Sequence, residues 1–271
     1  MARLVLRRMT SRNEDHFILM YHHVGPMDRL GSLSPYVVTP AAFAAQLAVI
    51  EARRLEVVTL GELVAATSGE RALEPRVVIT FDDCPRELLD AAVPELERRN
   101  WRATFFAVSG KVGGHNDWDV KRGSPRVPLM DWSDLRELAA RGHQIGAHGS
   151  SHTSLRRCTH SEARAELTGA RETIEQKMGT AVRSLAWPFG DIPDGYAGLC
   201  EDAGYDAACA IFSMSRKVLS DPFAIRRILV SERDVGLRMR VKLSRSYLRA
   251  RPLIVDRRAL KSTGAIPGRT T

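Results

Sequence analysis

The stretch Val77-Val78-Ile79-Thr80-Phe81-Asp82-Asp83 decides the fold and locates the chemistry. Its first five residues are apolar or β-branched, a composition typical of a strand buried on both faces of a parallel sheet. Two carboxylates follow at the predicted carboxyl end, where α/β folds carry their functional side chains. Acids after an apolar run also cap helices, so this stretch alone leaves a capping role open.

A second stretch, His148-Gly149-Ser150-Ser151-His152, favours a metal site because it supplies two imidazoles four residues apart. One carboxylate and two neutral imidazoles form a three-ligand set that suits zinc and related divalent ions. Of Asp82 and Asp83, one would then bind the metal and the other would take a proton from the attacking water. This chemistry hydrolyses an amide or an ester. The two histidines enclose Gly-Ser-Ser and lack the Glu of an H-E-x-x-H helix, which argues against a metalloprotease of that class.

The rest of the chain alternates predicted strands and helices about seven times, without internal repeats. Strands are predicted at 17–21, 57–59, 77–81, 103–108, 144–147, 182–187, 205–210 and 224–230. Such alternation predicts an α/β fold of parallel strands with right-handed crossovers. Seven or eight units favour a closed barrel over an open sheet, and all strand ends would then open onto one face.

Local signals place several helix ends. Thr39-Pro40 predicts an N-cap and first helical residue, and Pro94 is expected to divide the helix before residue 99. Ser133 is predicted to cap the next helix, and Thr159-His160-Ser161-Glu162 has the capping-box form. Residues 109–129 predict a long loop, of the kind that is often functional.

Composition is that of an ordinary globular protein, with 271 residues, 44% hydrophobic and 27% charged. Residues 1–15 lack the apolar core of a signal peptide, which leads us to expect a cytoplasmic protein. The four cysteines show no CxxC pairing and are expected to be reduced thiols.

Basic residues gather near the carboxyl terminus: residues 216–261 hold 14 Lys or Arg against 4 Asp or Glu. This segment is either a solvated basic face or a contact for an anionic membrane surface, and no nucleic-acid-binding motif accompanies it.

Three motifs resemble those of the polysaccharide deacetylases, the NodB-homology group of carbohydrate esterases. They are Thr80-Phe81-Asp82-Asp83, His148-x-x-x-His152 and Arg183 to Gly190, which reads RSLAWPFG. The resemblance implies a distorted (β/α)7, TIM-like barrel as a single domain over residues 17–235. A flexible basic N-terminus (1–16) and a basic, partly helical tail (236–271) would flank it.

The resemblance also implies roles. Asp82 would be the catalytic base, oriented by Arg183, and Asp83, His148 and His152 would bind a divalent metal, expected to be Zn2+. The following residues would contact substrate: Trp187, Pro188, Phe189, Asn116 and Trp118.

Two departures from the family pattern stand out. Cys84 replaces the Gly that usually follows the two aspartates, and Arg227 falls where a late motif often supplies a protonating His. Arginine stays protonated and is no general acid near pH 7. His22, at the end of the first predicted strand, is our candidate for that role, with ordinary packing as its alternative.

The expected function is removal of N-acetyl groups from amino sugars of a bacterial exopolysaccharide or its lipid-linked precursor, at the inner face of the membrane. A deformylase or O-deacetylase of a lipid-linked sugar would use the same metal residues. A catalytically silent carbohydrate-binding homologue is the third alternative, favoured by the missing late His and disfavoured by the clustered charges.

Overall fold

A computed structural model describes residues 15–26, 35–67, 74–211 and 218–253. Its main sheet consists of parallel strands in the order β10-β9-β8-β7-β6-β5-β1-β11, with β4 paired to the first half of β5. The strands are β1 (Phe17–Tyr21), β4 (Glu56–Val58), β5 (Arg76–Asp82), β6 (Thr104–Ala107), β7 (Gln144–Ala147), β8 (Ser184–Ala186), β9 (Ala207–Ala210), β10 (Ile225–Arg226) and β11 (Ile228–Leu229).

The sheet curls into a nearly closed barrel because one short segment pairs with both of its ends. β10 pairs with β9, and β11, only one residue further along the chain, pairs with β1. Arg227 lies between these two strands, and its backbone N–H donates to the carbonyl of Ala210. The predicted distorted (β/α)7 barrel is therefore confirmed.

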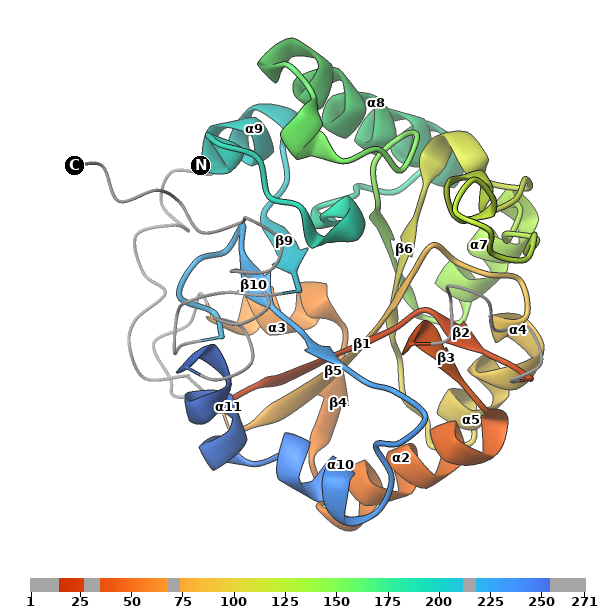
Figure 1. Cartoon of the computed structure of the whole chain (residues 1–271), viewed down its shortest axis with the longest axis vertical. Coiled ribbons are helices and arrows are strands. Elements are labelled where there is room, and N and C mark those ends of the chain that lie inside the picture. Colours follow the sequence, from red (N-terminus) through yellow and green to blue (C-terminus); the bar gives the residue numbers. More distant parts are fainter. Residues whose placement is uncertain (1–14, 27–34, 68–73, 212–217, 254–271) are drawn as a thin grey trace.

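Helices surround the strands (Figure 1). They are α2 (Pro40–Ala52), α3 (Leu60–Thr67), α4 (Leu88–Ala91), α5 (Val93–Glu97), α6 (Asp117–Val120), α7 (Trp132–Ala140), α8 (His160–Met178), α9 (Tyr196–Ala203), α10 (Leu237–Lys242) and α11 (Arg245–Arg251). Short 3-10 helices are η3 (Ser109–Lys111), η4 (Leu155–Arg157) and η5 (Pro188–Gly190), and β2 (His23–Val24) pairs with β3 (Val37–Val38) beside the barrel. No described helix is long and apolar enough to cross a bilayer.

Most helix ends follow the local sequence signals. Thr39 caps α2, and Thr159 and Glu162 form the capping box of α8. Pro94 is the second residue of α5, just after the break from α4 at Ala92. The prediction for α7 was wrong: its N-cap is Asp131, whose carboxylate accepts from the backbone N–H groups of Ser133 and Asp134. Asp and Ser are both good N-cap residues, so the sequence alone does not decide between Asp131 and Ser133 as the first residue of this helix cap.

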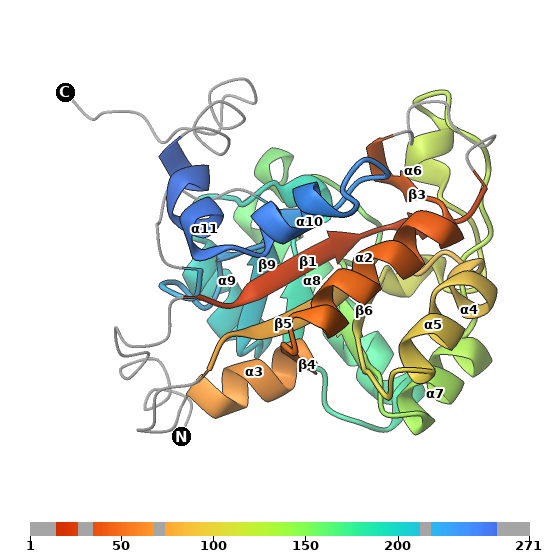
Figure 2. The same cartoon turned by 90° about the horizontal axis from the view of Figure 1, so that it is seen from below.

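The described part of the basic tail packs onto the barrel. α10 lies beside α2, and α11 lies beside α10 (Figure 2). Met239, Leu243 and Leu248 are buried in the same core as β1 and β5. Residues 1–14 and 254–271, which include most of the predicted flexible N-terminus and half of the predicted tail, lie outside the described residues.

Candidate active site

The carboxyl ends of the barrel strands surround a small inner pocket of about 80 Å³. β1 leads into His22, β5 into Asp82 and Asp83, β7 into His148, and β8 into Trp187. The pocket is lined by His22, His23, Tyr36, Asp82, Asp83, Trp118, Asp119, Arg122, His148, His152, Trp187, Phe189, Gly190 and Ile211. The parallel fold therefore brings together the carboxylates and imidazoles that the sequence placed at separate strand ends.

Asp83, His148 and His152 form a group that could hold a metal ion, with one ligand atom from each lying within 4.8 Å of the others. An Oδ1 atom of Asp83 is 3.6 Å from His148 Nε2 and 3.2 Å from His152 Nε2. The Nδ1–H of His148 donates to the carbonyl of Ala186 at 2.7 Å, which directs the Nε2 lone pair into the site. Burial lowers the pKa of His148, so its imidazole is held neutral, as a metal ligand must be.

Asp83 also has the character of a cation ligand. Its Oδ1 is buried without a hydrogen-bond partner among the described residues. Burial alone would raise the pKa of Asp83, but the imidazoles of His152, His148 and His22 outweigh it and hold the pKa low. An ionised carboxylate oxygen with no donor, facing two imidazole nitrogens, fits a divalent ion.

Asp82 is held by Arg227, not by Arg183. The two terminal nitrogens of Arg227 donate to the two oxygens of Asp82 at 2.6 and 2.7 Å, and one of them also donates to Thr80 Oγ1 at 3.2 Å. Both side chains are fully buried. Burial alone would raise the pKa of Asp82, but the charge and hydrogen bonds of Arg227 outweigh burial and lower the pKa. Asp82 is thus a fixed carboxylate, 4.0 Å from His148 Nε2.

The prediction that Arg183 orients Asp82 was wrong. Arg183 precedes β8, at the amino end of the barrel, where its guanidinium donates to the carbonyl of Gly204. The strand that follows separates it from the site. Arg227 was considered from the sequence only as a replacement for a late His. It occupies the orienting position because the chain passes there from β10, paired with β9, to β11, paired with β1, and the Arg227 side chain reaches Asp82 at the end of β5.

His22 does reach the site, with Nε2 3.8 Å from an oxygen of Asp82. Its ring packs on Tyr36 at a centroid distance of 4.6 Å. Burial lowers the pKa of His22 to about 4, although Asp82 and Asp83 oppose that shift. A neutral imidazole donates one hydrogen bond and accepts another, and it must gain a proton before it can act as an acid, so proton donation by His22 stays a prediction.

Aromatic side chains form the wall around His152. Trp118 stacks on the imidazole of His152 with 4.2 Å between the ring centroids. Phe189 and His152 form a T-shaped pair with 4.4 Å between their centroids. Trp187 is fully buried and its Nε1–H donates to the carbonyl of Phe223, while Pro188 is buried beside it. Trp118 and Phe189 therefore present the faces that a sugar ring can contact.

Asn116 lines neither the inner pocket nor the larger one next to it, contrary to its predicted contact with substrate. Its amide donates to the carbonyl of Pro125 and accepts from the N–H of Val127. These bonds fold the 109–129 loop and thereby position Trp118. Six residues that line the inner pocket were not predicted as site residues, namely His23, Tyr36, Asp119, Arg122, Gly190 and Ile211. Their only signal was their place in or near loops that follow predicted strands.

The sequence profile of the polysaccharide deacetylases matches residues 69–208, about half of the chain. The chain belongs to this family. The matched region contains Asp82, Asp83, His148 and His152, whereas His22 and Arg227 lie outside it.

Relatives of this deacetylase-family chain include poly-beta-1,6-N-acetyl-D-glucosamine N-deacetylase of Staphylococcus epidermidis. That protein is 24% identical over 79% of this chain and 78% of its own length. Chitin deacetylase 1 of Cryptococcus neoformans is 28% identical over 46% of this chain, but only 23% of its own length is matched.

Solved structures share the fold. Streptococcus pyogenes deacetylase PplD, in complex with acetate, superposes with a TM-score of 0.72 at 17% identity over 84% of this chain and 98% of its own. IcaB from Ammonifex degensii gives a TM-score of 0.68 at 20% identity, over 86% and 99% of the two chains.

Proposed function

We propose that this protein is a metal-dependent hydrolase that removes N-acetyl groups from amino sugars of a bacterial exopolysaccharide. One observation carries the proposal: a carboxylate fixed by a buried arginine lies beside a carboxylate and two imidazoles arranged as metal ligands. Two relatives are named poly-beta-1,6-N-acetyl-D-glucosamine N-deacetylase and chitin deacetylase, and these names support the choice of substrate.

The ligand set fits zinc, because Asp83, His148 and His152 offer one oxygen and two neutral nitrogens with room for further ligands. When bound, such an ion polarises a carbonyl and makes water more acidic. Asp82 is placed to take the proton from the attacking water, since Arg227 keeps it ionised and fixed in orientation. His22, 3.8 Å from Asp82, is the group in reach to take that proton from Asp82 and pass it to the departing amine.

The aromatic wall would position the sugar. Trp118 and Phe189 flank His152, so a pyranose ring lying on them would direct its 2-acetamido group toward Asp82 and Asp83. Holding the acetamide close to Asp82 in this way makes the reaction effectively unimolecular, which raises its rate.

The deciding experiment measures metal content and acetate release together. Zinc-loaded protein is expected to contain about one ion per chain and to release acetate from β-1,6-linked N-acetylglucosamine oligomers. His148→Ala and Asp83→Ala should lose both properties, whereas Asp82→Asn should keep the metal and lose turnover. A wild-type protein that binds no zinc would contradict the proposal and favour a carbohydrate-binding protein.

We further propose that the substrate is met in the cytoplasm, as a lipid-linked precursor, with the basic tail resting on the inner membrane surface. Support comes from exposed Leu237 and Val241 on α10, interleaved with Arg238 and Arg240. Each well-placed cation contributes about 1 kcal/mol near an anionic surface. The variant Leu237→Ser/Arg238→Gln/Arg240→Gln should release the protein from phosphatidylserine vesicles in sedimentation, and unchanged binding would refute this placement.

A further inference from the structure

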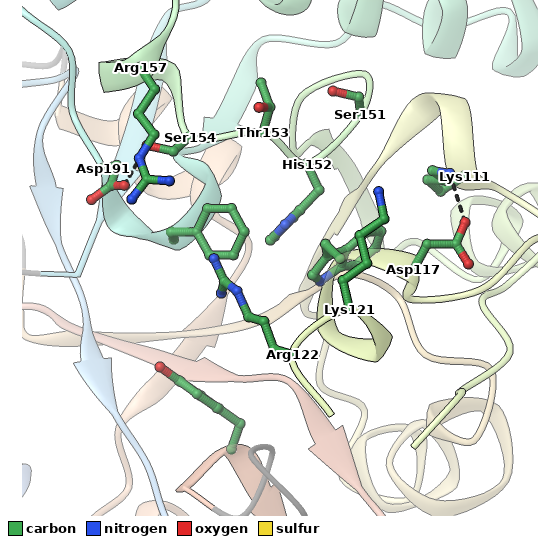
Figure 3. Close-up of a pocket in the computed structure, with 13 residues that line it drawn as sticks. Lys111, Asp117, Lys121, Arg122, Ser151, His152, Thr153, Ser154, Arg157 and Asp191 are labelled. Atoms are coloured by element: carbon green, nitrogen blue, oxygen red, sulfur yellow. Dashed lines mark hydrogen bonds and ion pairs between the residues drawn. The ribbon is translucent and has the colours of Figure 1, made fainter. Parts of the chain in front are cut away.

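A larger outer pocket of about 710 Å³ adjoins the inner pocket (Figure 3). The two pockets share five lining residues, namely Tyr36, Trp118, Arg122, His152 and Phe189. A chain of sugars whose reacting residue lies on His152 would therefore continue into the outer pocket. The residues that line only the outer pocket would contact the neighbouring sugars and not the scissile amide.

The outer pocket carries an excess of positive charge. Its lining has four cations, Lys111, Lys121, Arg122 and Arg157, against two carboxylates. Both carboxylates are already engaged: Asp117 accepts from Lys111 at 2.8 Å, and Asp191 accepts from Ser154 Oγ at 2.6 Å.

The other three cations have no ion-pair partner within the described ranges of the chain. They are Lys121 and Arg122, which follow α6, and Arg157 of η4. Figure 3 shows Arg157 reaching the space around His152 from one side, and Lys121 and Arg122 from the other. Two segments remote in sequence thus aim unpaired positive charge at the same space.

Arg122 is held in place for such a contact. Its guanidinium lies over the ring of Phe189 with 4.3 Å between the guanidinium carbon and the ring centroid. A guanidinium stacked by its face keeps its N–H groups free at the edge, where they match the paired oxygens of a phosphate or carboxylate. A neutral sugar chain would need none of this charge.

We infer that the outer pocket binds an anionic group, a phosphate or a uronate carboxylate, carried by the glycan next to the sugar that is deacetylated. This inference deepens the proposed function and rests on it for the position of the reacting sugar. The same charges repel ammonium groups, so a chain with neighbouring free amino sugars would bind less well than one still acetylated.

The test begins with binding alone, using oligosaccharides that have no acetamide and so cannot react. Calorimetry on the zinc-loaded protein compares tetragalacturonate, a phosphorylated maltotetraose and neutral maltotetraose. Either anionic probe should bind at least tenfold more tightly than the neutral one in low salt, and the tighter of the two identifies the anion. The advantage should shrink as ionic strength rises.

The variant Lys121→Gln/Arg122→Gln/Arg157→Gln should lose at least tenfold in affinity for the preferred anion. A matched control, Arg156→Gln/Arg164→Gln/Arg249→Gln, removes the same charge from exposed arginines outside the pocket lining. It should bind the anion as the wild type does. Equal binding of anionic and neutral probes, or equal losses in the two triple variants, would overturn the inference.

Acetate release separates this result from the proposed function. The ratio of kcat/KM for a hyaluronan tetrasaccharide, which alternates glucuronate and N-acetylglucosamine, to that for chitotetraose should fall at least tenfold in the pocket variant, through KM. An unchanged ratio would overturn the inference. If zinc-loaded wild type releases acetate from no oligosaccharide, the deacetylase proposal fails, while the binding result still decides whether the pocket takes an anion.

Discussion

Arg227 is fully buried, and its fork of nitrogens meets both oxygens of Asp82. A buried ion pair of this geometry contributes little net stability, but it fixes the orientation and charge of the carboxylate. The carbonyl of Arg227 itself accepts a hydrogen bond from Arg251 of α11, so the segment is anchored from both sides. The base is thus positioned by the barrel wall and not by a mobile loop.

Replacing Arg227 with lysine tests this role. Lys keeps the positive charge but cannot form the two parallel bonds, so Asp82 should lose its fixed orientation and kcat/KM should fall about 100-fold with metal content retained. Arg183→Gln, which alters a side chain bonded to Gly204, should stay within about twofold of wild type. Acetate release and elemental analysis on the three proteins decide the matter, and a larger loss in Arg183→Gln would restore the interpretation drawn from the sequence.

Residues with left-handed backbone explain why some site features were hard to predict. Asp83, Cys84, His152 and Phe189 have φ values of 67°, 56°, 57° and 57°. Glycine adopts this region without strain, which accounts for its usual presence at the position of Cys84. Such strain clusters where surrounding structure fixes a functional site. The residue types and their spacing were enough to predict the metal ligands. The left-handed backbone conformations depend on tertiary contacts, which local sequence patterns do not predict.

At the scale of elements, the fold is largely predictable because its signals are local. The β1 and β5 strands are buried along almost their whole length, as apolar runs predict. The division of β10 from β11 could not be read, since Ala224 to Val230 looks like one continuous strand. Arg227 lies at this division and bonds Asp82. Because the two strands were predicted as one, the residue that orients Asp82 was predicted wrongly.

The cap of α7 provides a second test at this scale. Asp131→Ala removes the carboxylate that accepts from the N–H groups of Ser133 and Asp134, and should lower the free energy of unfolding by about 1 kcal/mol. Ser133→Ala leaves those bonds intact and should cost clearly less. Urea unfolding of both variants measures the difference, and a larger effect of Ser133→Ala would place the cap where the sequence suggested.

His16 ties the start of β1 to β5, because its Nδ1 accepts from the backbone N–H of Arg76 at 3.2 Å. Burial, with help from Arg76, lowers the pKa of His16 from 6.5 to about 4. The unfolded chain therefore binds the extra proton as pH falls below 6.5. Stability from this residue is complete above that pH, decreases toward pH 4 and levels off below it.

His16→Asn keeps an acceptor near the position of Nδ1 and cannot titrate. Between pH 7 and pH 5 the wild type should lose about 2 kcal/mol more unfolding free energy than this variant. His160→Asn, altered at the exposed first residue of α8, should follow the wild type. Urea titrations at the two pH values give the comparison, and parallel pH curves for wild type and His16→Asn would exclude the assignment.

At the scale of the whole molecule, the site joins parts of the barrel that are distant in sequence. Asp83 follows β5, whereas His148 and His152 follow β7, and the base is fixed by the segment that closes the barrel. The sequence indicated which strand ends meet, because parallel strands share a carboxyl edge. It did not indicate that α10 and α11 complete the core, since a basic helix with few apolar residues also suits a free surface.

A metal ion held by Asp83, His148 and His152 would link β5 to β7 and bind only the folded chain. Free zinc at 100 times its Kd should therefore raise the free energy of unfolding by about 2.7 kcal/mol. For a chain of this size that corresponds to a Tm about 5 to 10 °C higher than in chelator. Thermal unfolding followed by circular dichroism should show this difference in wild type and in His160→Ala, and should show none in His152→Ala. Equal Tm values for wild type with zinc and with chelator would mean that the three side chains do not form a metal site, and the hydrolytic mechanism would lose its basis.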